Sequence, residues 1–389
     1  NGAVTGSAKY RGQELVGLPT KELNKVRGAK VTMIFQEPMT SLDPLYTIGR
    51  QIAEPIVYHR GGSRKDARKR VLELLELVGI PDPARRIDSY PHELSGGQRQ
   101  RVMIAMALAN EPDVLIADEP TTALDVTIQA QILKLLRSLQ ERFGMAIVLI
   151  THDLGIVRHF AERVVVMRRG EVVEQGDTRQ IFENPQTAYT RMLIDAEPHG
   201  RKEPPATNAP IILEGRAVTV DFQINKGFLS KGPATFRAVN GVNVRLQEGQ
   251  TIGVVGESGS GKSTLGRALL RLIQSDGHYR FGREDISRHD RKRMRSLRKE
   301  LQLVFQDPYG SLSPRQTVGE IITEGLLVHE PGLSKADRDR RAIAALEEVG
   351  LDPKARNRYP HEFSGGQRQR IAIARAMILK PQVVILDEP

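Results

Sequence analysis

The chain contains the same motif-rich segment twice, and the two copies are separated by more than half of the chain's length. The segment SYPHELSGGQRQR at residues 89–101 returns as RYPHEFSGGQRQR at residues 358–370, and each copy is followed by an apolar run that ends in Asp-Glu-Pro. Two copies so far apart require two similarly folded halves rather than a small repeated unit. The 389 residues are enough for two domains that each bury a core of their own.

The register of the repeat also shows which motifs have no copy. Gln36 corresponds to Gln306, and Ser95 corresponds to Ser364 at nearly the same spacing. The first spacing places a counterpart of Gly256 before the first residue, and the second places a counterpart of His152 after the last. We therefore expect a fragment, cut at both ends, of a protein with two homologous domains. The expected parts are a first domain at 1–196, a proline-rich linker at 197–210 and a second domain at 211–389.

Composition excludes several classes of protein. The absence of cysteine excludes disulfides and thiolate metal sites within these residues, and no apolar run approaches the ~18 residues of a membrane span. The net charge of +10 is densest at 60–70 and 287–300, where acids and bases are mixed without aromatic residues. Such stretches favour solvated helices, then weak contact with lipid headgroups, and no direct binding of nucleic acid.

The order of apolar runs and motifs predicts an α/β fold. Four β-rich runs each end at a motif of polar or glycine residues, and helical stretches alternate with them. The expected strands are 114–117, 146–150, 251–255 and 383–386. An open α/β sheet binds its ligand at such strand ends. Between Gln36 and Ser95, and again in the second half, an amphipathic helical pattern predicts an inserted helical subdomain.

The segment GESGSGKST predicts a phosphate-binding loop, because it fits G-x-x-x-x-G-K-[ST] between a β-like run and a helical run. Its glycines let backbone amides wrap phosphate oxygens, Lys262 can reach the β and γ phosphates, and Ser263 can ligate Mg²⁺. The expected loop residues are Gly256, Glu257, Ser258, Gly259, Ser260, Gly261, Lys262, Ser263 and Thr264.

Two carboxylates follow a buried run in each half of the chain. Asp118 and Asp387 are suited to hold Mg²⁺, directly or through its water shell. Glu119 and Glu388, one residue later, are suited to accept a proton from an attacking water molecule or to orient it. An isolated Asp-Glu pair would more often be a turn, but the repeat and the phosphate loop favour catalysis.

The repeated LSGGQ segment combines a helix cap with exposed backbone. Ser95 has Gln98 three residues later, which is the spacing of a capping box before a helix. Glycines at a helix start leave bare backbone amides that can bind an anion. We therefore expect both copies to contact phosphate, through Ser95, Gly96, Gly97, Gln98, Ser364, Gly365, Gly366 and Gln367.

Three further polar residues end apolar segments. His152 follows the run at 146–150, and its spacing from Glu119 favours a γ-phosphate sensor over an ordinary histidine. Gln36 and Gln306 begin the in-register segments QEP and QDP, so they are candidate ligands of Mg²⁺ or of the attacking water.

These motifs, with TTALD at 121–125, resemble the ATPase domains of ABC transporters over nearly the whole chain. The details FQEPMTSLDPLYTIG and NPQTAYTRML resemble the peptide-importer branch, and the tandem order is similar to fused ATPase subunits of oligopeptide or microcin C importers, with glutathione importers as relatives. The resemblance implies ATP and Mg²⁺, two transmembrane permease subunits, an external peptide-binding protein, and a peripheral position on the cytoplasmic face of the membrane.

The resemblance also implies two composite sites with unequal residues. The site of Lys262 would use Gln306, Asp387 and Glu388 from its own domain and Ser95, Gly97 and Gln98 from the other. The second site would combine Gln36, Asp118, Glu119 and His152 with Ser364, Gly366 and Gln367, without a phosphate loop in these residues. An aromatic residue that stacks on adenine is expected, and both Phe222 and Phe236 fit.

Three alternatives share parts of this pattern. A soluble tandem ATPase of ribosomes fits the basic charge, although such proteins usually have a long charged helical linker. A DNA-repair ATPase of the same superfamily would be expected to carry zinc-binding cysteines. A regulatory module that has lost its chemistry conflicts with the intact Lys262, Asp387 and Glu388. The peptide itself and the direction of transport are not encoded in these motifs.

Overall fold

The computed structural model describes residues 4–37, 41–122, 124–196, 203–224 and 234–388. The chain divides into two compact units, Asn1–Arg201 and Lys202–Pro389. Of the linker expected at 197–210, residues 197–202 lie outside the described part of the chain.

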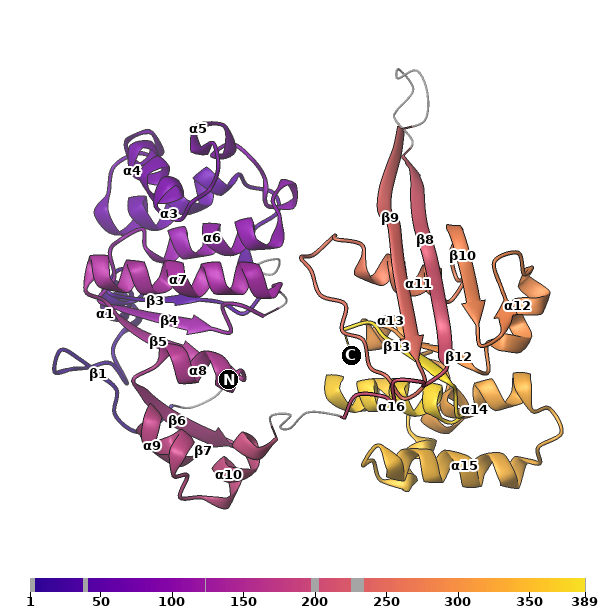
Figure 1. The fold of residues 1–389 in the computed structure, drawn as a ribbon. Coiled ribbons are helices and arrows are strands. Elements are labelled where there is room, and N and C mark those ends of the chain that lie inside the picture. Colours follow the sequence, from indigo (N-terminus) through magenta and orange to yellow (C-terminus); the bar gives the residue numbers. More distant parts are fainter. Residues whose placement is uncertain (1–3, 38–40, 123, 197–202, 225–233, 389) are drawn as a thin grey trace. The chain divides into compact units, whose positions relative to one another are not determined.

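The first unit contains a three-stranded parallel sheet, a group of helices and a carboxyl-terminal hairpin (Figure 1). Its strands are β1 (Lys9–Tyr10), β2 (Gln13–Glu14), β3 (Val31–Ile34), β4 (Val114–Asp118), β5 (Ala146–Ile150), β6 (Arg163–Arg168) and β7 (Glu171–Asp177). Its helices are α1 (Thr20–Val26), α3 (Ile48–Arg60), α4 (Arg64–Leu77), α5 (Pro83–Arg86), α6 (Gly96–Ala107), α7 (Val126–Phe143), α8 (Leu154–Phe160), α9 (Thr178–Glu183) and α10 (Ala188–Asp195).

The sheet of the first unit has the order β3-β4-β5, with all three strands parallel. Val31 pairs with Val114, and Asp118 pairs with Ile150. Because the strands are parallel, the residues that follow them meet at one edge of the sheet. The expected strands at 114–117 and 146–150 are present as β4 and β5. The strand order brings the residues that follow β3, β4 and β5 together at that edge.

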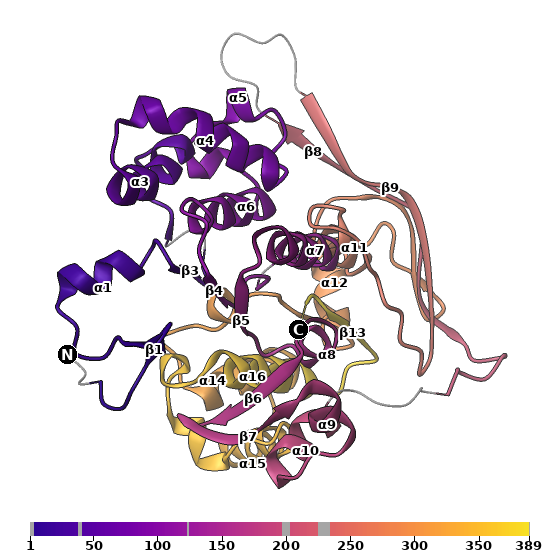
Figure 2. The ribbon, with the colours of Figure 1, turned by 90° about the vertical axis from the view of Figure 1, so that its left-hand side faces the viewer.

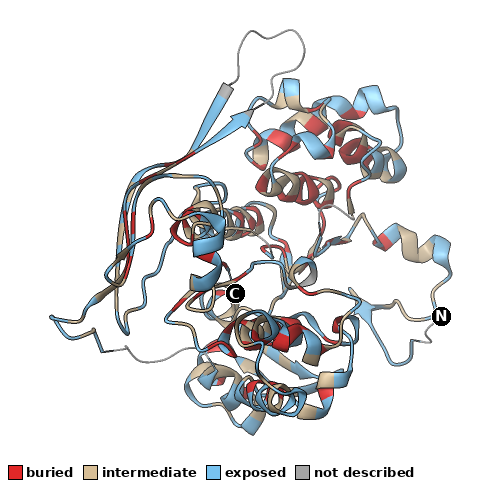
Figure 3. Ribbon diagram, turned by 90° about the vertical axis from the view of Figure 1, so that its right-hand side faces the viewer, coloured by how far each residue is buried: buried red, intermediate tan, exposed pale blue. Residues whose placement is uncertain are grey.

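Helices α3, α4 and α6 of the first unit pack on one another, as Figure 2 shows. Their facing sides bury Ile52, Leu74 and Ile104 completely, because apolar residues recur at helical spacing. Helix α4 begins with a capping box in which Ser63 and Asp66 satisfy each other's backbone amides. In Figure 3 the buried stretches lie within helices and strands, whereas most connecting segments are exposed.

The second unit holds a four-stranded antiparallel sheet of order β11-β10-β8-β9 and a separate parallel pair, β12-β13. Its strands are β8 (Ile211–Ile224), β9 (Ala234–Gln247), β10 (Asp276–Phe281), β11 (Glu284–Asp285), β12 (Leu301–Val304) and β13 (Val383–Leu386). Its α-helices are α11 (Lys262–Leu269), α12 (Arg291–Leu297), α13 (Pro308–Ser311), α14 (Val318–His329), α15 (Lys335–Glu348) and α16 (Gly365–Met377).

The parallel pair of the second unit repeats the register of the first. Leu301 pairs with Val383 as Val31 pairs with Val114, which confirms the repeat at the level of single residues. Helices α14, α15 and α16 contact one another as α3, α4 and α6 do. Helix α11 packs on β8, where Leu269 meets a core that includes the fully buried Tyr279.

One expected strand is wrong. The sequence predicts a buried strand at 251–255 before the phosphate loop, but these residues have no strand structure, and residues 251–260 are exposed throughout. An extended segment becomes a strand only when a neighbouring strand pairs with its backbone. In the described part of the second unit, strands β12 and β13 pair only with each other, so residues 251–255 have no partner.

Within the described residues, no helix is long and apolar enough to span a membrane.

Candidate functional site

The phosphate loop of the second unit runs through left-handed backbone conformations into α11. Gly259 has φ +79° and Gly261, the residue before the helix, has φ +92°. At Gly261 a Cβ would lie 2.3 Å from the backbone oxygen of Ala238, so no larger residue fits there without a shift of the backbone. The Nζ of Lys262 donates to the carbonyls of Gly256 at 2.7 Å and Glu257 at 2.9 Å, which holds the ammonium group within the loop.

The loop helix and strand β13 bring a hydroxyl to a buried carboxylate. The Oγ of Ser263 donates to the Oδ1 of Asp387 at 2.6 Å. The backbone amide of Asp387 donates to Val304 on β12, which fixes the residue at the end of the strand pair. Its side chain is only 8% exposed.

This pair fits a magnesium ion. The Oδ2 of Asp387 is buried and accepts no hydrogen bond from the described residues. The nearest cation is the guanidinium of Arg267, at 3.9 Å. Mg²⁺ prefers one or two oxygen ligands of the protein together with phosphate and water, and a buried carboxylate oxygen beside a hydroxyl offers that set. No group of three histidine or acidic residues suited to a metal occurs within the described residues, so an ion here would depend on phosphate oxygens.

The catalytic candidates Gln306 and Glu388 lie in direct contact. The Nε2 of Gln306 donates to the Oε2 of Glu388 at 2.5 Å. Glu388 has φ +47°, a left-handed conformation that is uncommon for a residue with a side chain. Residues held in this way often occur at functional sites, where the surrounding structure maintains the strain.

The first unit contains the same arrangement with one more member. The Nε2 of Gln36 donates to the Oε2 of Glu119 at 2.8 Å, and the Nδ1 of His152 lies 3.1 Å from the Oε1. Glu119 has φ +44°, and its amide donates to the carbonyl of Ile150 at the end of β5. Gln36 after β3 and His152 after β5 thus converge on the carboxylate that follows the central strand β4.

Thr122 also donates to this carboxylate, although the sequence analysis did not predict this contact. The Oγ1 of Thr122 donates to the Oε2 of Glu119 at 2.7 Å. This bond, followed by those from His152 and Gln36, holds the pKa of the Glu119 carboxyl below its usual value despite partial burial. Glu119 is therefore ionised at neutral pH, as a proton acceptor must be. The available signal was a hydroxyl three residues after the glutamate, a spacing that brings the two side chains together in a tight turn.

The LSGGQ segments form the helix starts that their spacing predicts. The Oγ of Ser95 accepts from the amide of Gln98 at 3.3 Å, and the amide of Ser95 donates to the Oε1 of Gln98 at 3.0 Å. Ser364 and Gln367 form the same capping box at the start of α16.

Gly365 and Gly366, which follow the cap residue Ser364, are not required for packing within their own unit. A Cβ at Gly365 or Gly366 would meet nothing within 4 Å, whereas one at Gly97 would press on Ile128 of α7. Bare backbone at the start of α16 is therefore open to contact from outside the unit.

Three further candidates lie on strands. Asp118 is the last residue of β4 and lies directly before Glu119. Phe222 on β8 and Phe236 on β9 are directly opposite each other in the sheet, and both are exposed. Both aromatic side chains are therefore accessible for stacking on adenine.

Comparison with known proteins decides the family. The model of the ABC transporter family matches residues 3–122 and 239–389 of this chain. The chain belongs to the ABC transporter family. The matched residues include the glutamine, LSGGQ and Asp-Glu segments of both units and the phosphate loop of the second.

Curated relatives of this ABC transporter chain are ATP-binding proteins. It is 59% identical over 387 residues to the peptidoglycan transport ATP-binding protein YejF of Agrobacterium fabrum, covering 99% of this chain and 70% of that protein. It is 50% identical to an uncharacterized ABC transporter ATP-binding protein YejF of Escherichia coli, with 99% and 73% covered. The glutathione import ATP-binding protein GsiA of Escherichia coli is 47% identical, with 97% and 65% covered.

Proposed function

We propose that this chain is part of the energy-coupling subunit of an ABC importer for peptides, with glutathione or another small substrate as the alternative cargo. The observation that carries the proposal is the edge of the second unit at which Ser263 meets Asp387 and Gln306 meets Glu388. The names of relatives in peptidoglycan transport and glutathione import support import of a peptide-like substrate.

We assign the chemistry at this edge to residues of the second unit. Residues 256–264 bind the phosphates of ATP, with Lys262 as the cation that contacts the terminal groups. Ser263 and Asp387 hold Mg²⁺, which neutralises charge on the phosphate oxygens when it is bound. Glu388 accepts the proton of the attacking water and Gln306 orients this carboxylate, because its amide already donates to it.

A second site is proposed around Glu119 in the first unit. Gln36, Asp118 and His152 serve this site as ligands of Mg²⁺, water or the γ-phosphate. The capped helix starts at 95–98 and 364–367 would contact the phosphates of ATP held by another domain, which the bare backbone at Gly365 and Gly366 supports. Helices α3–α5 and α14–α15 would be the inserted helical subdomains of the two domains.

The partners that we propose are two membrane-spanning permease subunits and an external peptide-binding protein. Each unit has a cavity that adjoins its glutamine. The first cavity, of about 710 Å³, is lined by Phe35 among others, and the second, of about 360 Å³, by Phe305. The next residue in each case is the glutamine bonded to the catalytic glutamate. Binding of permease segments in these cavities at the cytoplasmic face would therefore reach the site through one peptide unit.

The assignment of Glu388 is tested by Glu388→Gln in the complete protein. Loss of the proton acceptor should slow ATP turnover by at least ~100-fold while ATP still binds. Glu347→Gln, on the exposed side of α15, is the matched control and should turn over ATP normally. Unchanged turnover in Glu388→Gln would remove this residue from its role. Uptake of labelled peptide and of labelled glutathione by cells with and without the gene would then separate the two cargoes.

A further inference from the structure

The two cavities lie at corresponding positions of the repeat but differ in chemistry. Glu54 and His59 of α3 line the first cavity, and their counterparts in the repeat, Glu324 and His329 of α14, line the second. Both cavities therefore share a glutamate and a histidine on one wall. The lining from α6 and α16 differs, because the first cavity has Met106 of α6 where the second has its counterpart, Arg375 of α16.

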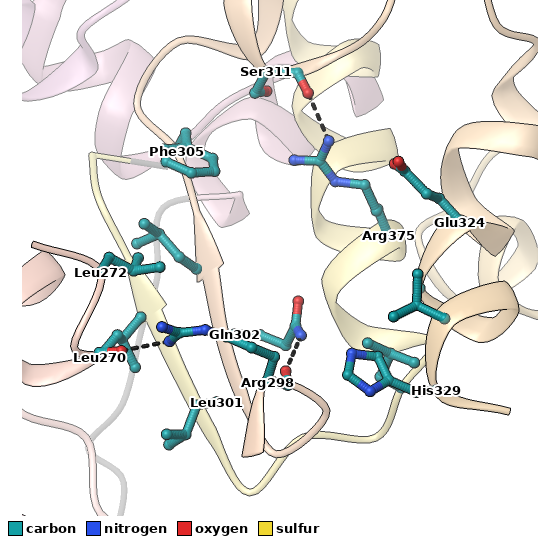
Figure 4. Close-up of a pocket in the computed structure, with 14 residues that line it drawn as sticks. Leu270, Leu272, Arg298, Leu301, Gln302, Phe305, Ser311, Glu324, His329 and Arg375 are labelled. Carbon is teal, nitrogen blue, oxygen red and sulfur yellow. Dashed lines mark hydrogen bonds between the residues drawn. The ribbon is translucent and has the colours of Figure 1, made fainter. Parts of the chain in front are cut away.

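The guanidinium of Arg375 is only partly satisfied. Its Nη1 donates to the carbonyl of Ser311 at 2.6 Å, as Figure 4 shows, and this is its one hydrogen bond within the described residues. Burial lowers its pKa, and the negative charge of Glu324 opposes that effect without forming an ion pair among those residues. A partly buried guanidinium keeps a planar fork of donors, which matches the paired oxygens of a carboxylate or a phosphate. Of these two groups, only the carboxylate belongs to the ordinary side chains of a protein segment.

The other cation of the second cavity does not compete for such a carboxylate. The guanidinium of Arg298 donates to the carbonyls of Leu270 and Arg271, so its charge is directed at its own unit. The first cavity offers no counterpart of Arg375. There the same wall is formed by the thioethers of Met103 and Met106, which adapt to apolar side chains.

We propose that the two cavities bind different partner segments, and that Arg375 selects for the second cavity a permease segment that carries an aspartate or glutamate among apolar residues. The first cavity takes a segment without that carboxylate. This inference rests on the proposed function and adds that the two permease subunits are not interchangeable on this chain. A carboxylate at Arg375 replaces lost hydration of the cation, whereas the thioether of Met106 offers a carboxylate no donor. The arginine of the first cavity, Arg27, is exposed and keeps its own hydration.

The test uses the lack of cysteine in these 389 residues. Val328→Cys places a thiol at the second cavity and Tyr58→Cys places one at the corresponding position of the first, and both residues are exposed. The complete protein, purified with its two permease subunits, is treated with a short bifunctional thiol–amine reagent, and the joined peptides are identified by mass spectrometry. We expect the two thiols to capture different permease subunits, with a carboxylate only in the segment joined to position 328.

The role of Arg375 is tested in the Val328→Cys background. Arg375→Met should lower the cross-link yield about tenfold, since a hydrogen bond to a charged group is lost, and Arg375→Lys should lower it less. Met106→Arg in the Tyr58→Cys background is the reciprocal change and should lower capture at the first cavity. Thermal melting of each variant shows that it is folded.

The outcomes separate the two levels of the proposal. Capture of one and the same segment from both positions, or an unchanged yield in Arg375→Met, overturns the inference and leaves the importer function standing. Capture of no permease subunit from either position overturns the proposed function together with the inference. In a charge swap, Arg375→Glu is combined with a change of the permease carboxylate residue to arginine. A cross-link yield restored by the second change would establish the ion pair directly.

Discussion

The phosphate loop provides a matched pair of glycines for a quantitative prediction. Gly259 and Gly261 both have left-handed backbone, with φ +79° and +92°. A Cβ at Gly259 would meet nothing within 4 Å, whereas one at Gly261 would lie 2.3 Å from the oxygen of Ala238. Alanine at either position thus carries the same conformational strain, and only Gly261→Ala adds a collision with the backbone of β9.

The expected magnitudes follow from these two terms. A left-handed conformation costs a residue with a Cβ about 1–2 kcal/mol, so Gly259→Ala should destabilise the start of α11 by roughly that amount. Overpacking costs typically about 1–3 kcal/mol more, and the obstacle at Gly261 is a backbone oxygen that cannot rotate away. Gly261→Ala should therefore cost about 2–5 kcal/mol in total.

Hydrogen–deuterium exchange of α11 measures this cost locally, in the complete protein without nucleotide. A local measurement is needed because a chain of several units does not unfold in one step. The amides of Leu265 and Leu269 should exchange roughly 5- to 30-fold faster in Gly259→Ala and faster again by a similar or larger factor in Gly261→Ala. Equal exchange in the two variants would refute the argument, because it would show that the collision with Ala238 has no energetic effect.

The carboxylates support three further predictions. Thr122→Val removes the largest contribution that lowers the pKa of Glu119, so this pKa should rise in a carbon-13 NMR titration; an unchanged value would contradict the hydrogen bond. Gln306→Glu replaces the amide that donates to Glu388 by a second acceptor of like charge, so ATP turnover should fall, and unchanged turnover would count against their contact. Glu174 has its pKa lowered from 4.5 to about 2 by backbone and hydroxyl donors, so the stability it contributes is present above pH 4.5 and is lost as the pH falls towards 2. Glu174→Gln should therefore flatten the dependence of the melting temperature on pH in this window, and equal slopes in both proteins would contradict it.

The sequence alone predicts those features that depend on local residue pattern. The runs at 114–117, 146–150 and 383–386 are strands in the structure, and the Ser-x-x-Gln spacing gives the capping box twice. In these segments an apolar alternation or a cap decides the structure without help from distant residues. The grouping of Gln36 and His152 with Glu119 was implied by the resemblance to ABC ATPase domains, and the parallel order of β3, β4 and β5 brings the three residues together.

The remaining features depend on contacts that no local pattern contains. Residues 251–255 have the composition of a strand, but strand formation needs a neighbour with free hydrogen-bonding groups, and none pairs with them in the described residues. The left-handed backbone of Glu119 and Glu388 was equally hidden, since neither residue type favours it. The contact of Thr122 with Glu119 becomes visible only once the turn after β4 is known.

The junction of cavity and carboxylate explains how partner binding can change chemistry in each unit. Phe35 lines the first cavity and Gln36 donates to Glu119, and the same two steps recur at Phe305, Gln306 and Glu388. Because one peptide bond joins each phenylalanine to the glutamine that follows it, a displacement of the phenylalanine would move the glutamine with it. A segment bound in the cavity would thus act on the proposed proton acceptor over a single residue. Both glutamates have a left-handed backbone that the surrounding residues hold in place. A shift of one of these neighbours can therefore change the position of the carboxylate.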